Sequence, residues 1–186
     1  MTLNTGRCAV LLLLAGSLLA GCNGVQAGHK VDDCDAINKL RDIKLSMDTV
    51  DRKILNLRPD PVTVESIKGL VGDYRQAEST YQGLLAEATT ELDRSRSKAG
   101  AAPDLVKTWE RLVESLTERR DGIHFFADVF SDPASLARDF PSFSQKTQEL
   151  LRKQGDVNAR LQAQMTATLK ARGFKQRGDG QFAIDC

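Results

Sequence analysis

Apolar side chains recur at alternating spacings of three and four residues through most of this chain. The spacing is regular from Leu40 to Leu57, from Val64 to Leu92, from Leu105 to Phe130 and, with more polar positions, from Leu150 to Leu169. This pattern is typical of amphipathic helices that pack against one another along a narrow seam. It predicts four long helices.

Proline residues place the breaks between these segments. Pro ends a helix because it lacks an N–H donor and obstructs the preceding turn, although the first turn tolerates it. The expected helices therefore run from Asp32 or Asp33 to the residues before Pro59, from Asp60 or Thr63 to about Ser97, from Leu105 to Phe130, from Pro133 to about Asp139, and from Phe143 to Arg172. The expected core positions of the last helix are Leu150, Leu151, Val157, Leu161, Met165 and Leu169.

Four long helices joined by short breaks predict an all-α protein with the topology of an up-down-up-down four-helix bundle. The short helix that begins at Pro133 falls in the third connection. Gly173 is expected to cap the last helix, and residues 175–186 to form a short, partly extended tail. In this topology the start of the first helix and the end of the last helix lie at the same end of the bundle.

A separate apolar run, Ala9 to Ala20, precedes the helical part of the chain. Arg7 supplies a positive charge before it, and polar Asn23 follows too soon for a membrane span, which needs about 20 apolar residues. This order is typical of a secretory signal, with an uncleaved anchor as a less favoured alternative. The run ends in Leu19-Ala20-Gly21-Cys22, which resembles the lipobox of bacterial lipoproteins.

The lipobox resemblance covers residues 1–22 alone. It implies that residues 1–21 are a signal peptide that is removed, and that Cys22 carries a diacylglyceryl thioether and accepts acylation on its amine. Asn23 stands where an Asp often retains lipoproteins in the inner membrane, so the resemblance implies an outer-membrane destination if the source has two membranes. Residues 22–31 then form a flexible tether, and residues 32–186 form the helical domain. The alternative is an ordinary signal peptide that happens to end in Cys.

Charge limits the partners of the exported part. Arg7 is the only charged residue before Cys22, so equal numbers of basic and acidic residues remain after it. No basic face is available for a nucleic acid, and no Lys or Arg cluster follows Cys22 to hold anionic lipid. We therefore expect no nucleic-acid partner, and contact with the membrane through the lipid on Cys22.

Four cysteines are present, and two of them remain for other chemistry. Cys8 leaves with the signal peptide and Cys22 takes the lipid, which leaves Cys34 and Cys186. Disulfides persist outside the cytoplasm, and the predicted topology brings these two residues to one end of the bundle. We expect a disulfide between Cys34 and Cys186; two free or intermolecular thiols are the alternative.

Five of the seven Phe residues fall near the opposite end of the predicted bundle: Phe125, Phe126, Phe130, Phe140 and Phe143. If they are exposed, they form a candidate interaction patch for a partner or ligand. If they are buried, they close the open end of the core, which is the favoured alternative.

Charged residues at helical spacing offer weaker candidates. Glu78 occupies a polar position in an otherwise apolar seam, and His124 lies between two Asp residues. An acidic strip with successive spacings of four, four and three residues is a solvated face, with a partner site as the less favoured alternative; its members are Glu110, Glu114, Glu118 and Asp121. One imidazole without a second gives little support for a metal site, so none is expected.

Motifs that carry catalysis are missing from the chain. It has no HExxH, GxSxG, Walker-type, CxxC or dinucleotide-binding sequence, so we expect no enzyme and no cofactor. The favoured hypothesis is a lipid-anchored cell-envelope bundle that acts as a structural or adaptor module and binds an unidentified envelope protein. The alternative is a periplasmic or surface binder of a small hydrophobic ligand, and an enzyme that uses carboxylates alone has the least support.

Overall fold

The structure is a computed structural model that describes residues 33–57, 63–98, 100, 102–176 and 182–183. Leu40–Asp185 form one compact unit, and the described residues 33–39 belong to a second. Apart from two short strands, every described element is a helix, which confirms the predicted all-α bundle class. None of the described helices combines the length and the apolar composition needed to cross a lipid bilayer.

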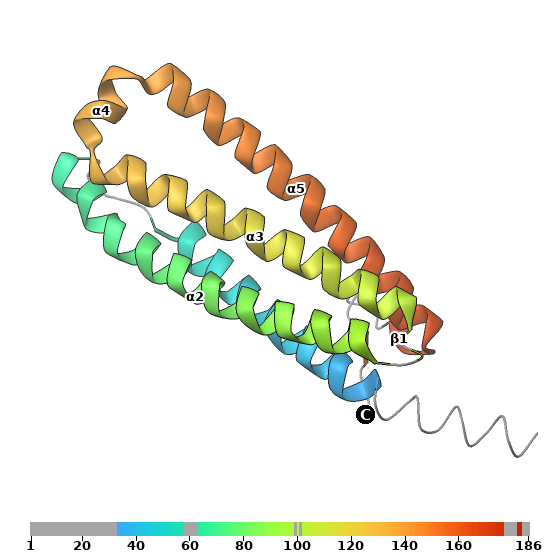
Figure 1. Cartoon of the computed structure of the whole chain (residues 1–186). Helices are drawn as coiled ribbons and strands as arrows, with labels where there is room; N and C mark the ends of the chain where they lie inside the picture. The colour runs from blue at the N-terminus through green and yellow to red at the C-terminus, as the bar shows by residue number, and fades with distance from the viewer. Residues whose placement is uncertain (1–32, 58–62, 99, 101, 177–181, 184–186) are drawn as a thin grey trace, which may run out of the picture. The chain divides into compact units, whose positions relative to one another are not determined.

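The first helix covers residues 33–55, and α2 follows at Val64–Ser97 (Figure 1). Thr63 caps α2 in a capping box: its side chain accepts from the Ser66 N–H, while the Ser66 hydroxyl accepts from the Thr63 N–H. This satisfies two backbone donors that the first turn of a helix otherwise leaves without partners. Of the two starts expected from the sequence, Thr63 is therefore correct.

The helices α3 (Pro103–Ser131), α4 (Pro133–Arg138) and α5 (Phe140–Ala171) complete the helical part. The short helix expected at Pro133 is confirmed, and the Asp132 side chain caps it by accepting from the Ser135 N–H. α5 begins three residues earlier than predicted. The prediction treated Pro141 as a break, whereas the first turn of α5 accommodates it because no N–H is needed there.

Gly173 ends α5 in the way that the sequence predicts. Its φ is 79°, and its N–H donates to the Lys170 carbonyl while the Phe174 N–H donates to the Leu169 carbonyl. This pair of bonds is a Schellman motif, and the positive φ favours Gly at the position. The tail continues as β1 (Lys175–Gln176), which pairs antiparallel with β2 (Phe182–Ala183).

Within the larger unit, α2 and α3 are antiparallel, and so are α3 and α5. Side-chain contacts join α3 to α5 at both ends: Asp104 with Arg172, and Phe125 with Phe143. α4 contacts α2, α3 and α5 and so turns the chain from α3 into α5. Because α4 lies across this end, the start of α5 stands over the end of α3 (Figure 1).

The core runs along the seam of the long helices. Buried apolar residues of the larger unit include Leu40, Ile43, Met47, Tyr81, Ala88, Trp109, Leu112, Leu116, Val157 and Leu161. Of the core residues expected on α5, Val157, Leu161 and Leu169 are buried, and Leu150 and Met165 are half-buried. The prediction for Leu151 is wrong: this residue is 59% exposed, because it lies one step off the face that carries Val157 and Leu161.

Candidate functional site

Of the cysteines singled out in the sequence, one lies within the described residues. Cys34, on the first helix, is disulfide-bonded. Cys22 and Cys186 lie outside the described residues, so lipidation at Cys22 and the pairing of Cys34 with Cys186 stay predictions.

The five Phe residues expected to gather do lie together, and Tyr74 of α2 joins them. The Phe125 and Phe143 rings stack at 6.0 Å between centroids, and Phe143 also contacts Phe126, Phe130 and Phe140. Tyr74 meets the Phe130 ring edge-on at 5.2 Å. We call these six residues the aromatic cluster: Tyr74, Phe125, Phe126, Phe130, Phe140 and Phe143.

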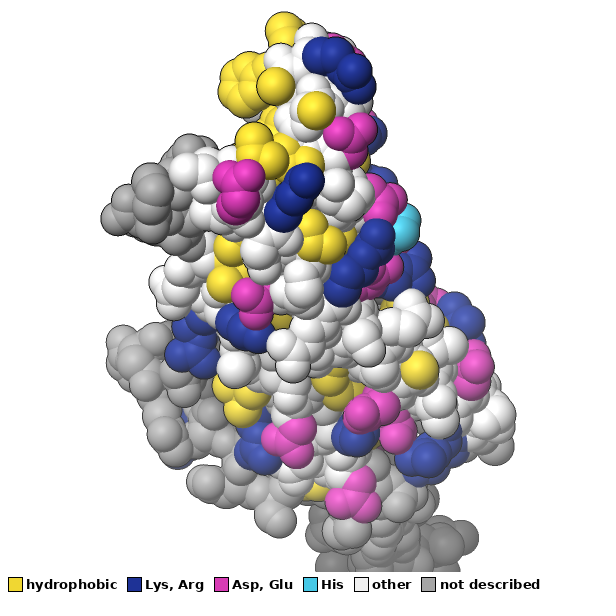
Figure 2. All heavy atoms as spheres, turned by 90° about the vertical axis from the view of Figure 1, so that its left-hand side faces the viewer, with side chains coloured by type: hydrophobic (Ala, Val, Ile, Leu, Met, Phe, Trp, Pro, Cys, Tyr) yellow, Lys and Arg dark blue, Asp and Glu magenta, His cyan; other side chains and the backbone are white. Residues whose placement is uncertain are grey.

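The aromatic cluster is neither fully exposed nor fully buried. Tyr74 is buried, Phe140 is 59% exposed, and the other four rings are half-buried. Figure 2 shows this end of the molecule, where hydrophobic side chains gather in a broken band over the helices and charged side chains flank them. The cluster therefore closes the end of the core with its inner rings and presents apolar surface with its outer ones.

A groove opens beside the cluster, between the end of α3, α4 and the start of α5. Its volume is about 440 Å³. The apolar lining comes from all three helices: Phe125, Val129, Leu136 and Phe143. A volume of this size holds either a small ligand or two to three large side chains of a partner.

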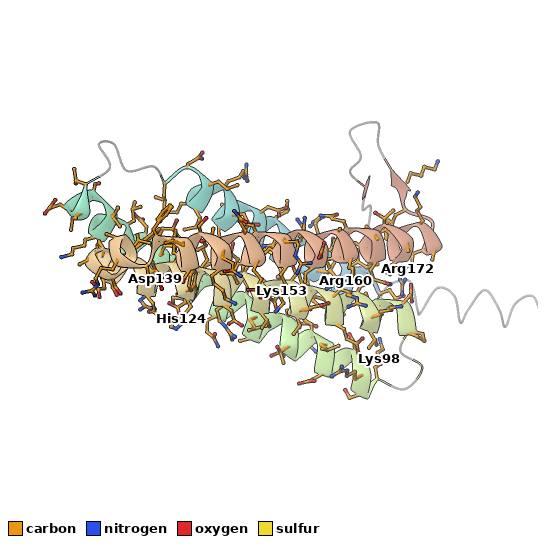
Figure 3. The ribbon with its side chains drawn as sticks, turned by 90° about the horizontal axis from the view of Figure 1, so that it is seen from above. Lys98, His124, Asp139, Lys153, Arg160 and Arg172 are labelled. Carbon is orange, nitrogen blue, oxygen red and sulfur yellow. The ribbon has the colours of Figure 1, made fainter. Side chains whose placement is uncertain are left out.

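Charged residues stand around this groove. Asp128, Asp132 and Asp139 line it together with one cation, Lys146. Lys146 pairs with Glu149 at 3.2 Å, and Asp132 caps α4. The Asp139 side chain is exposed and makes no capping hydrogen bond, although Asp139 holds the N-cap position of α5 (Figure 3).

A charged network adjoins the groove on the side of α2. The Arg75 guanidinium contacts Glu78 and Asp128, and His124 lies between the same two carboxylates, 2.8 Å from Glu78 and 3.2 Å from Asp128. The hydrogen bond from Arg75 holds the pKa of Glu78 below its usual range, and the bond to His124 acts in the same direction. Glu78, the polar seam position, is thus satisfied between α2 and α3.

This network is not a metal centre. Within the described part of the chain, no group of three or more His, Cys, Asp and Glu side chains is arranged to hold a metal ion. Arg75 stands among the carboxylates, and a guanidinium is a permanent cation that would repel a metal.

The acidic strip of α3 is neutralised by neighbouring helices. Glu110 pairs with Arg96 of α2, and Glu118 pairs with Lys153 of α5. Glu114 contacts Arg111 and Arg160, and the Arg111 hydrogen bond lowers the pKa of Glu114. Because Glu110, Glu114 and Glu118 already pair with basic side chains on the surface of the same bundle, the strip is not a free acidic face for another molecule.

Halfway along the bundle, polar side chains from four helices meet. Arg119 of α3 pairs with Asp51 of the first helix at 3.0 Å, and it donates to Ser115 and to Asn158 of α5. The Tyr81 hydroxyl of α2 donates to Asp51. We call these five residues the polar layer: Asp51, Tyr81, Ser115, Arg119 and Asn158.

Burial gives the polar layer its electrostatic character. Tyr81 is fully buried, and the Arg119 side chain is 9% exposed. Burial and the bond to Asp51 raise the pKa of Tyr81 far above its ordinary value, so the hydroxyl stays a donor. Arg119 stands at a polar position in the apolar seam of α3, so the sequence offers a signal for it. The sequence analysis missed Asp51, although it lies four residues after Met47 and so falls in the seam of the first helix.

A second surface depression lies at the other end of α2 and α3. It is lined by Arg96, Pro103, Val106, Lys107, Glu110 and Arg111. Arg96 and Arg111 are already paired with Glu110 and Glu114, and none of the described residues that line it is aromatic. The groove beside the aromatic cluster is therefore the stronger candidate for a binding site.

No protein-family model, curated protein or solved structure matches this chain.

Proposed function

We propose that this protein is a lipid-anchored component of a bacterial cell envelope whose helical bundle binds another envelope protein. The lipobox resemblance at Leu19-Ala20-Gly21-Cys22 supports the anchor. The aromatic cluster and its groove support the binding role. We propose no catalytic activity.

The observation that carries the binding role is partial exposure of aromatic rings beside an open groove. Aromatic side chains provide large contact areas at low entropic cost, and they are enriched at protein interfaces. Four half-buried rings and Phe140 at 59% exposure leave apolar surface in water at one end of the bundle. A partner that covers this surface gains the free energy of burying it.

Cross-linking from the cluster tests this proposal. Phe140 is replaced by p-benzoyl-phenylalanine in the full chain, and membranes from the native cells are irradiated. Leu151 gives the matched control, since it is an apolar residue of α5 with the same 59% exposure but lies away from the groove. We expect one protein cross-linked from position 140 and absent from position 151. Repeated recovery of the uncross-linked chain alone would count against the proposal.

The anchor is tested separately by labelling. Cells that express the chain are grown with a radioactive or clickable fatty acid, and the protein is recovered. We expect the label on the wild-type chain and its loss in Cys22→Ser. Label that persists in the variant contradicts acylation at Cys22.

A small hydrophobic ligand is the second candidate, because the groove volume of about 440 Å³ lies within the range of ligand pockets. Mass spectrometry of the protein under native conditions distinguishes the two. A bound small molecule that is displaced when Phe143 is replaced by a polar residue favours the ligand hypothesis.

A further inference from the structure

We propose that the groove between α3, α4 and α5 binds a basic amphipathic helix of the partner protein. This inference rests on the proposed binding role of the same surface and adds the chemistry of what binds there. The partner helix places apolar side chains on the groove floor and Lys or Arg side chains against Asp139 and its neighbours on the rim.

The floor of the groove fits the apolar face of a helix. Phe125 and Val129 come from α3, Leu136 from α4 and Phe143 from α5, and all four are half-buried. Side chains at i, i+3 or i+4 of a helix project from one face, and helices commonly bind proteins by laying such anchors into a groove. The volume of about 440 Å³ accommodates two to three of them.

The rim of the groove supplies the charge preference. Three carboxylates line it against one ammonium, and that ammonium already pairs with Glu149. Asp128 is paired with Arg75 and contacts His124, while Asp132 accepts from the Ser135 N–H. The Asp139 carboxylate is exposed on the groove and has no cap bond of its own. The charge left over at the rim is therefore negative.

The same charge disfavours other kinds of partner. A nucleic acid or an anionic lipid surface would bring phosphates against these carboxylates, and like charges across an interface oppose binding. A small apolar molecule would contact the floor but leave the rim carboxylates and the outer ring of Phe140 in water. A helix with apolar anchors and flanking cations satisfies both parts of the site.

The test is a selection on the purified chain lacking residues 1–21, with a display library of random peptides as the probe. Enriched peptides are synthesised, and their dissociation constants are measured by fluorescence anisotropy. We expect apolar residues at i, i+3 and i+4 spacing next to Lys or Arg, and helical circular dichroism on binding. Asp139→Lys turns an attraction for the peptide cations into a repulsion. We therefore expect it to raise the dissociation constants of these peptides by about tenfold or more.

Matched variants separate charge from fold. Asp139→Asn is expected to weaken binding less than Asp139→Lys does. Asp139→Glu keeps the negative charge and is expected to bind the peptides as the wild type does. Asp93→Lys, at an exposed position of α2 away from the groove, is expected to change nothing. Circular dichroism melting of each variant reports whether the bundle stays folded.

Two outcomes overturn the inference, and they bear differently on the proposed function. Peptides that bind the groove with no basic preference, and equally well to Asp139→Lys, refute the basic helix but leave the binding role intact. If no enriched peptide competes with the protein cross-linked from position 140, the partner does not use such a helix. If position 140 also yields no cross-link, the proposed binding role fails as well.

Discussion

The two halves of the bundle on either side of the polar layer are packed differently. On the side of Trp109, Leu112 and Leu161, large apolar side chains are fully buried, and we call this the closed half. On the side of the aromatic cluster, which we call the open half, Phe126 and Phe143 are only half-buried. Among the described residues of the larger unit, every large side chain exposed by less than 2% lies in the closed half, in the polar layer or next to it.

This difference separates stability from binding along one set of helices. A fully buried Leu or Trp gains all of its hydrophobic stabilisation within the fold. A half-buried Phe gains only part of it, and the remainder is available to a partner. The same α3 therefore serves the fold near Leu112 and the groove near Phe125, with Arg119 between them.

The largest expected effect contrasts two matched truncations. Leu112→Ala removes a fully buried side chain in the closed half and is expected to lower the free energy of unfolding by about 3 kcal/mol. Leu136→Ala removes a half-buried side chain on the groove, and is expected to cost less than about 1.5 kcal/mol. Urea unfolding of the chain lacking residues 1–21 measures both. Equal losses would erase the distinction between the halves.

The polar layer is tested by breaking its ion pair. Asp51→Leu leaves Arg119 buried without its carboxylate, and is expected to cost about 2 to 3 kcal/mol. That value is below the cost of breaking a fully buried pair, because the Asp51 side chain is 32% exposed. Arg119→Met is expected to cost a similar amount. The double variant should lose less than the two losses added together, and strict additivity in chemical denaturation would show that the pair is not coupled.

The smallest expected effect concerns the far end of the closed half. Arg172 contacts the Asp104 carboxylate, and this bond lowers the pKa of Asp104 in the folded protein. A lowered folded pKa contributes stability above the unfolded pKa, and that contribution is lost as the pH falls through the folded value. Because Asp104 is partly exposed, we expect less than about 1 kcal/mol. As the pH is lowered from about 5 to about 2, the melting temperature of Asp104→Asn should fall by less than that of the wild type. Parallel curves would contradict this contribution.

Much of the fold could be predicted because the apolar seam repeats over whole helices, with single polar positions such as Glu78 and Arg119. The spacing from Val64 to Leu92 and from Leu105 to Phe130 marks the faces that α2 and α3 bury, except at Val64, which is 48% exposed in the first turn of α2. The ends of helices were harder. Pro133 and Pro141 both stand in first turns, but only Pro133 follows a residue whose side chain caps the helix.

The candidate site was predictable only in part. Three Phe residues near the end of α3 and two near the start of α5 fall at the same end of an antiparallel pair, and the sequence order alone shows that. The groove depends on the angle at which α4 crosses, and sequence spacing carries no information on that angle. The sequence also could not predict that the Asp139 carboxylate makes no capping hydrogen bond, because Asp directly before a helix typically caps it.

The acidic strip shows how a charged face in the sequence can suggest a binding site that the fold does not leave free. On α3 alone, Glu110, Glu114 and Glu118 resemble a surface waiting for a basic partner. Arg96 of α2 and Lys153 and Arg160 of α5 form ion pairs with these carboxylates. The sequence alone does not show which residues of different helices pair. The groove rim differs because, among the residues that the structure describes, Asp139 has no capping hydrogen bond and no basic partner.

The polar layer also gives this bundle a distinguishing fingerprint. Leu and Ala can exchange places along a seam in countless unrelated proteins, so apolar spacing identifies a class and not a lineage. An Asp, a Tyr, an Arg and an Asn drawn from four successive long helices into one cross-section make a far rarer combination. A remote homologue whose apolar residues no longer show detectable sequence similarity should still be recognisable by these four polar residues.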